Sequence, residues 1–112
     1  MVYRKAVLFL LLSEDLTFTG IKPVVISEIR SLAARYGIKR ILLFGSRARG
    51  DYRRDSDIDL AVSGGDIARF RLALEEETST LLQYDVIDLD STGSPELLEA
   101  ISKEGVILHE EI

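Results

Sequence analysis

The residues best suited to chemistry are a glycine–serine pair, Gly45-Ser46, and two aspartates beyond a gap of ten residues, Asp57 and Asp59. A glycine at the end of an apolar run lets a ligand approach the backbone closely because it has no Cβ. A helix beginning at Ser46 would direct free N–H groups at an anion such as a triphosphate. Two aspartates two residues apart on a strand lie side by side and can bind hard divalent cations. The pattern indicates metal-assisted displacement at phosphorus, with a turn and a solvated polar face as the structural alternatives.

The charge distribution supports a phosphate-bearing small ligand. The whole chain has a net charge of −5, which argues against stable nucleic-acid binding. Between residues 39 and 54, however, six basic residues accompany a single acid, Asp51. Arg47 and Arg49 lie beside the glycine–serine pair and could bind phosphate oxygens in a forked geometry, whereas Arg53 and Arg54 are expected to be solvated.

Periodicity and breakers predict the elements that must position these residues. In chain order they are a helix over 22–36, a buried strand over 40–44, a polar loop over 49–56, a strand over 57–62, a helix from Asp66 to about Leu82, a strand over 85–89, a helix opening at Pro95 and an apolar run over 106–108. This order predicts an α/β (α+β) fold, a small mixed sheet with helices packed on it.

Length and composition indicate one domain in a chain of 112 residues, without cysteine and therefore without disulfides or thiolate metal sites. The apolar run Ala6–Leu12 is too short to span a membrane and lacks a cleavage site, so we expect a cytoplasmic protein with no membrane association. We divide the chain into an N-terminal extension, residues 1–21, and a domain over residues 22–112.

Two segments, Gly45-Ser-Arg-Ala-Arg-Gly50 and Ser56-Asp-Ile-Asp-Leu60, resemble the signature of the minimal nucleotidyltransferases of the DNA polymerase β superfamily. The resemblance covers about residues 22–110 and implies the polymerase-β-like fold. The family also needs a third carboxylate, and the run Tyr84-Asp-Val-Ile-Asp88 offers Asp85 and Asp88, which lie on opposite faces of a strand. The family pattern favours Asp85.

The resemblance implies an Mg²⁺-dependent enzyme with two ions, or Mn²⁺ in their place, held by Asp57, Asp59 and Asp85. Gly45, Ser46, Arg47 and Arg49 would bind the nucleotide, and Asp85 would be the base or the metal-sharing group that receives the acceptor hydroxyl. The implied reaction transfers AMP from ATP to a hydroxyl of a partner protein, as the antitoxin of a pair with a HEPN-domain toxin. A non-catalytic binding module and an enzyme with a small-molecule acceptor are the alternatives, and a homo-oligomer and a hetero-complex both stay open.

Overall fold

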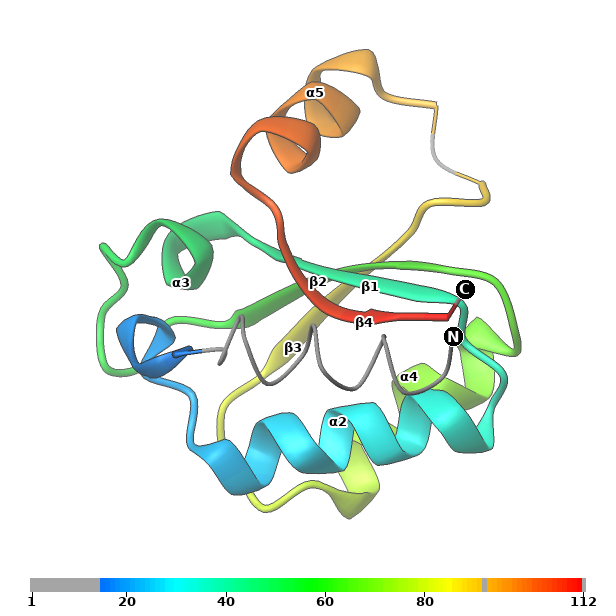
Figure 1. Cartoon of the computed structure of the whole chain (residues 1–112), viewed down its shortest axis with the longest axis horizontal. Coiled ribbons are helices and arrows are strands. Elements are labelled where there is room, and N and C mark those ends of the chain that lie inside the picture. Colours follow the sequence, from blue (N-terminus) through cyan, green and yellow to red (C-terminus); the bar gives the residue numbers. More distant parts are fainter. Residues whose placement is uncertain (1–14, 92, 112) are drawn as a thin grey trace, which may run out of the picture.

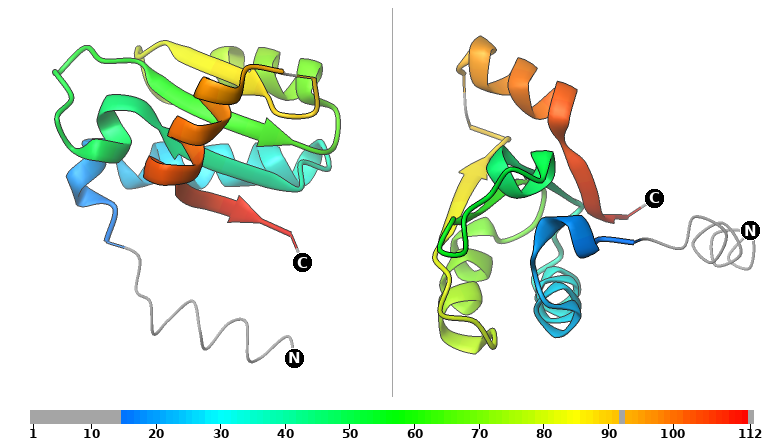
Figure 2. Two further views of the ribbon diagram at one scale, coloured as in Figure 1. Left: turned by 90° about the horizontal axis from the view of Figure 1, so that it is seen from above. Right: turned by 90° about the vertical axis from the view of Figure 1, so that its left-hand side faces the viewer.

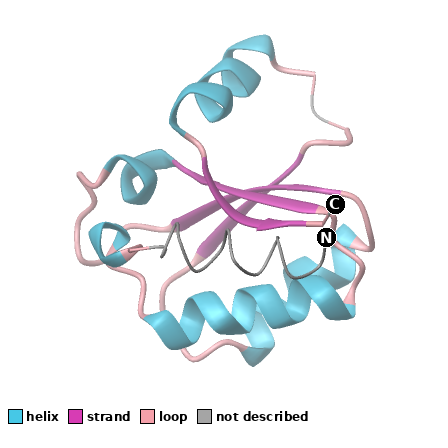
Figure 3. Ribbon diagram, in the orientation of Figure 1, coloured by secondary structure: helices cyan, strands magenta, loops and turns pink. Residues whose placement is uncertain are grey.

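The computed structural model describes residues 15–91 and 93–111. The elements are η1 (Thr17–Thr19), α2 (Pro23–Arg35), β1 (Arg40–Phe44), α3 (Gly45–Arg49), β2 (Ile58–Ser63), α4 (Ile67–Glu77), β3 (Tyr84–Asp88), α5 (Pro95–Glu104) and β4 (Val106–Glu110). The predicted class, a small mixed sheet with helices packed on it, is confirmed (Figures 1 and 3). No helix in the described part is long and apolar enough to cross a membrane.

The four strands form one sheet in the order β3-β2-β1-β4. β1 runs antiparallel to both β2 and β4, whereas β2 and β3 run parallel. A parallel pair requires a crossover, and α4 supplies it between the end of β2 and the start of β3. β1 therefore ends at the end of the sheet where β2 and β3 begin, so three segments of the chain meet there.

Helices cover the two faces of the sheet unequally (Figure 2). α2 and α4 pack on one face and enclose the main core, in which Leu43, Leu60 and Phe70 are fully buried. The other face carries α5. The smaller cluster beneath α5 consists of Leu42, Phe44, Ala61 and Ile101. Because side chains alternate along a strand, every second residue of β1 and β2 belongs to this less covered face.

α4 is shorter than the sequence predicted, since it ends at Glu77 rather than near Leu82. Thr78 already has extended backbone angles, φ −94° and ψ 152°. Glu28 of α2 then accepts hydrogen bonds from the backbone N–H and the hydroxyl of Ser79, both at 2.7 Å. This contact between distant segments fixes a turn where the apolar spacing alone favoured more helix.

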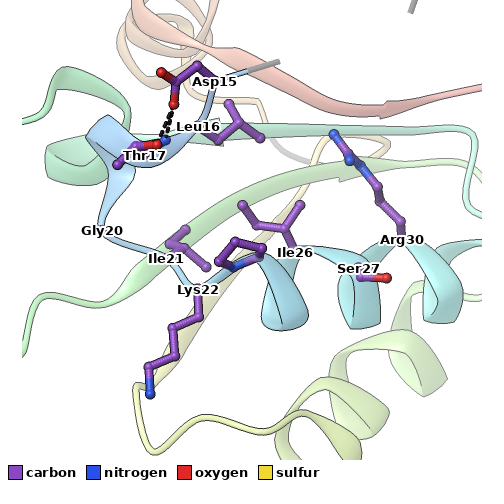
Figure 4. A pocket seen from close by; sticks show the side chains of 10 residues that line it. Asp15, Leu16, Thr17, Gly20, Ile21, Lys22, Ile26, Ser27 and Arg30 are labelled. Atoms are coloured by element: carbon purple, nitrogen blue, oxygen red, sulfur yellow. Dashed lines mark hydrogen bonds between the residues drawn. The ribbon is translucent and has the colours of Figure 1, made fainter. Parts of the chain in front are cut away.

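The predicted N-terminal extension is described from residue 15 onward, and the apolar run Ala6–Leu12 lies outside the described residues. Thr19 and Ile21 are buried against the domain. A hollow of about 470 Å³ lies between this segment and α2, with Leu16 and Ile26 among its lining residues (Figure 4). The domain boundary at residue 22 stays a prediction, but the segment just before it contacts the core.

Candidate active site

Three aspartates lie at the end of the sheet where β2 and β3 begin. Asp57 directly precedes β2, Asp59 is its second residue, and Asp85 is the second residue of β3. Asp59 is the register partner of Asp85 in the parallel pair and of Phe44 in the antiparallel pair. Register partners project to the same face, so Asp59 and Asp85 lie on the face that carries α5. Asp57 shares this face because it precedes Asp59 by two residues.

Asp88, the alternative third carboxylate, lies elsewhere. It pairs with Val62 at the other end of β3, three residues from Asp85 and therefore on the opposite face. Its Oδ1 atom accepts a hydrogen bond from Asp90 N at 2.9 Å, which closes the turn after β3. The geometry thus separates Asp88 from the other aspartates.

Gly45 brings the backbone of the β1–α3 turn against Asp59. Its φ of +76° is in the left-handed region that favours glycine, and a Cβ at this position would overlap Oδ2 of Asp59. Ser46, the next residue, is partly exposed, and its hydroxyl makes no hydrogen bond within the described residues. The turn therefore combines close approach to a carboxylate with a hydroxyl that a ligand can use.

Asp59 has a strongly perturbed acidity. Burial, and then the nearby carboxylates of Asp85 and Asp57, raise the pKa of Asp59 to about 6, while the positive charges of Arg49 and Arg47 oppose this rise. The negative charge at this end of the sheet is thus only partly balanced. A raised carboxyl pKa of this kind is frequent at functional sites.

None of these three carboxylates has an ion pair or hydrogen bond within the part of the chain that the structure describes. Nearby cations are bound to other groups. Arg49 donates from Nε to Asp51 at 3.2 Å and from Nη1 to Glu104 at 3.2 and 3.3 Å. The three carboxylates therefore stay available to an added cation.

Arg47 differs from the expected phosphate-binding residue because its guanidinium is buried, with 1% of the residue exposed. Nε, Nη1 and Nη2 donate to backbone carbonyl oxygens of three segments. The acceptors are Ser56 O at 3.0 Å, Thr19 O at 2.8 Å and Arg54 O at 3.3 Å. The guanidinium carbon also lies 4.6 Å from the centre of the Tyr52 ring. Arg47 therefore holds three loop segments together in this conformation. Its side chain acts on Asp59 only through the electrostatic effect of its positive charge.

Glu104 is a residue of this site that the sequence reasoning did not select. Its Oε1 atom accepts a hydrogen bond from Gly45 N at 3.0 Å, and both carboxylate oxygens accept from Arg49. Glu104 lies within residues 22–110, over which the chain resembles the family, but sequence spacing alone does not bring residue 104 next to residue 45.

A divalent cation fits the donor set, although the described side chains do not converge into a ready-made metal site. Carboxylate oxygens are the ligands that Mg²⁺ and Mn²⁺ prefer, and the three carboxylates form no ion pair with another described residue. The raised pKa of Asp59 also favours cation binding at this site. A bound cation would offset the repulsion from Asp85 and Asp57 that contributes to the raised pKa.

Comparison with known proteins agrees with this geometry. A family model described as polymerase beta nucleotidyltransferase matches residues 27–111, so the chain belongs to this family and carries a nucleotidyltransferase domain. The family predicted from the sequence motifs is confirmed.

Several relatives and solved structures are similar to the chain. The candidate protein adenylyltransferase MJ0604 of Methanocaldococcus jannaschii is 41% identical over 61 residues, which cover 53% of this chain and 59% of that protein. The match thus spans less than two thirds of MJ0604. Protein adenylyltransferase MntA of Thermococcus cleftensis is 33% identical over 69 residues, 60% of this chain and 70% of that protein. A crystal structure of a toxin–antitoxin with AMP-PNP contains a chain that is 32% identical, with a TM-score of 0.63 and coverage of 77% of this chain and 73% of that one.

Proposed function

We propose that this protein transfers AMP from ATP to a hydroxyl group of a partner protein, and that it acts as the antitoxin of a toxin–antitoxin pair whose toxin is a HEPN-domain protein. The single observation that carries the proposal is the group of three aspartates beside a glycine turn, whose carboxylates form no ion pair with another described residue. Relatives named as protein adenylyltransferases and a similar toxin–antitoxin structure with AMP-PNP support the choice of reaction and partner.

In the proposed reaction, the oxygen of the acceptor hydroxyl attacks the α-phosphorus of ATP. The bond between the α-phosphorus and the oxygen that leads to the β-phosphorus breaks, and pyrophosphate leaves. The hydroxyl proton passes to the carboxylate of Asp85, which acts as general base. Ser46 donates its hydroxyl to a phosphate oxygen, Arg49 binds another, and Gly45 leaves room for the triphosphate next to Asp59.

Asp57, Asp59 and Asp85 would also hold the metal, as two Mg²⁺ ions or Mn²⁺. When bound, the metal supplies positive charge that neutralises the triphosphate and the charge developing at phosphorus. The three carboxylates by themselves carry the same sign of charge as the nucleotide. Their mutual repulsion makes the site weak for an unneutralised triphosphate, which would meet three like charges.

A protein acceptor is favoured over a small molecule because similar proteins are named protein adenylyltransferases and a similar solved structure is a toxin–antitoxin with AMP-PNP. The partner would bring its acceptor hydroxyl to the open end of the sheet. A cytoplasmic location accords with an ATP-dependent reaction and stays part of the proposal.

The function is tested by co-expressing the chain with the product of the neighbouring gene and measuring the intact mass of that partner. We expect the partner to gain the mass of one or more AMP groups with the wild type and to gain none with Asp59→Asn. Asp88→Asn is the matched control, with the same chemical change on the opposite face of the sheet. Neutralisation of the partner by Asp59→Asn without any mass change would support a contact-only binding module instead.

A further inference from the structure

Glu104, the last residue of α5, binds both the glycine turn and Arg49. Its Oε1 atom is 3.0 Å from Gly45 N, and its two carboxylate oxygens are 3.2 and 3.3 Å from Nη1 of Arg49. These are charge-assisted hydrogen bonds, which are stronger than neutral ones. One side chain thereby connects the end of α5 to the first and last residues of α3.

The sheet fixes the place of Glu104. Val106 opens β4 and pairs with Leu43 of β1, so the residues just before Val106 lie beside the end of β1. Gly105 N donates to Ile101 O at 2.8 Å, which closes the last turn of α5 directly onto the strand. The Glu104 side chain is only 25% exposed as a result. Its carboxylate has little freedom to leave the turn.

Arg49 is held by two carboxylates at once. Nε donates to Asp51 at 3.2 Å, and Nη1 donates to Glu104. Among the described residues no hydrogen bond uses Nη2, and the positive charge of Arg49 acts on Asp59 without a direct ion pair. The guanidinium plane is therefore oriented on two sides while one donor nitrogen stays unused. Such a fixed fork loses little rotamer freedom when it binds a phosphate.

We infer that Glu104 is a positioning residue of the nucleotide site: it fixes the guanidinium of Arg49 so that Nη2 can bind a phosphate oxygen, and it holds the Gly45 turn against Asp59. This inference rests on the proposed function, since it assigns a role in binding the triphosphate. Without the Glu104 carboxylate, Arg49 keeps one anchor and is free to swing toward the unpaired aspartates, where it competes with a metal ion.

The test is a double-mutant cycle on ATP affinity, measured by calorimetry with Mg²⁺. The variants are Glu104→Gln, Arg49→Gln and the double variant. Glu104→Gln keeps an oxygen that can accept from Gly45 N but loses the charge that holds Arg49. We expect it to weaken ATP binding about tenfold, the lower end of what indirect positioning residues contribute at metal sites. The double variant should bind no more weakly than Arg49→Gln, because Glu104 acts through Arg49.

Glu99→Gln is the matched control on the same helix. Glu99 pairs with Lys103 at 2.9 Å on the exposed face of α5, so its change removes the same charge without touching the turn. We expect unchanged ATP affinity for this variant. Thermal melting of every variant establishes that it is folded. A second comparison uses Arg49→Lys, which removes the planar fork of the guanidinium. In the Arg49→Lys background, Glu104→Gln should leave the ATP affinity almost unchanged.

This experiment distinguishes failure of the proposed function from failure of the role assigned to Glu104. A wild type that binds no ATP with Mg²⁺ would contradict the proposed function and, with it, the role of Glu104. Wild-type binding with additive losses from Glu104→Gln and Arg49→Gln, or an equal loss in Glu99→Gln, would contradict only the role of Glu104. A residue that merely stabilised the fold would give the additive result.

Discussion

Asp59 of β2 stands directly opposite Asp85 of the parallel strand β3, and both side chains project to the face that carries α5. Neither carboxylate forms a direct ion pair with another described residue. Two carboxylates so placed repel each other, and this repulsion contributes to the raised pKa of Asp59. Ionisation of both carboxylates therefore destabilises the isolated domain, and a bound cation would relieve this repulsion.

The register predicts which carboxylate the reaction needs. Asp85→Asn should lower AMP transfer by about a hundredfold or more, the usual contribution of a general base. Asp88→Asn should leave it within about twofold, as is usual for a surface change away from the site. Initial rates of transfer with labelled ATP measure both. If Asp88 proved essential and Asp85 dispensable, the assignment of the base would be wrong even though the family is established.

A second prediction concerns the dependence of stability on pH. The pKa of Asp59 is about 6 in the folded protein against an ordinary value of 3.8 for an aspartate, so the folded state binds this proton more tightly. Ionisation of Asp59 therefore lowers the free energy of unfolding. This destabilisation is absent below pH 4, grows as the pH rises from about 4 to 6, and is complete above that window. Asp59→Asn should stabilise the metal-free protein by about 1–2 kcal/mol at pH 8, after a discount for partial solvent exposure.

Urea unfolding in the presence of a chelator at pH 4 and at pH 8 measures this difference. The stabilising effect of Asp59→Asn should nearly vanish at pH 4, where the wild-type carboxyl is mostly protonated. Asp55→Asn, in the exposed loop before β2, serves as the control for loss of a charge alone. Equal stabilisation by Asp59→Asn at both pH values would show that repulsion and burial at Asp59 are not its cause.

Arg47 should contribute to stability more than to nucleotide contact. Arg47→Met removes the donors of three backbone carbonyls and should cost about 3 kcal/mol of unfolding free energy. Arg53→Met, at an exposed loop position, should stay within about 0.5 kcal/mol of the wild type. Chemical denaturation gives both values. A cost for Arg47→Met no larger than that for Arg53→Met would contradict its structural role.

Nucleotide binding should depend on a divalent metal. We expect ATP affinity to fall at least about tenfold when a chelator removes Mg²⁺, because the triphosphate then faces three carboxylates without compensation. Asp57→Asn should reduce the size of this metal effect. Calorimetric titrations with and without chelator provide the measurement, and equal affinity in both would argue against metal ligation by these aspartates.

The sequence predicted the parts of this structure that depend on local patterns. The alternation around Asp57 and Asp59 and the odd spacing from Asp85 to Asp88 are local, so the sequence already placed Asp85 and Asp88 on opposite faces. The apolar run before Gly45 is local too, and it forms the predicted strand. The resemblance to the family then favoured Asp85 over Asp88 as the third carboxylate.

Features that depend on contacts between distant segments were not predictable in this way. The burial of Arg47 requires carbonyl groups from the segments around Thr19 and Ser56 to converge on one guanidinium. Glu104 reaches Gly45 only because β4 pairs with β1, a register interrupted by an irregularity between Ile41 and Leu42. From the sequence alone, Arg47 in a polar segment and Glu104 at a helix end would both be expected to lie in solvent. Only the contacts between distant segments show that they do not.

The central claim is transfer of AMP, and the position of a label in ATP tests it most directly. The chain, Mg²⁺ and its neighbouring-gene partner are incubated with ATP labelled at either the α- or the γ-phosphate. We expect the α-label to become covalently attached to the partner and the γ-label to be released as pyrophosphate, and we expect Asp59→Asn to abolish both. Attachment of the γ-label, or attachment of neither label while the partner is still neutralised, would contradict it.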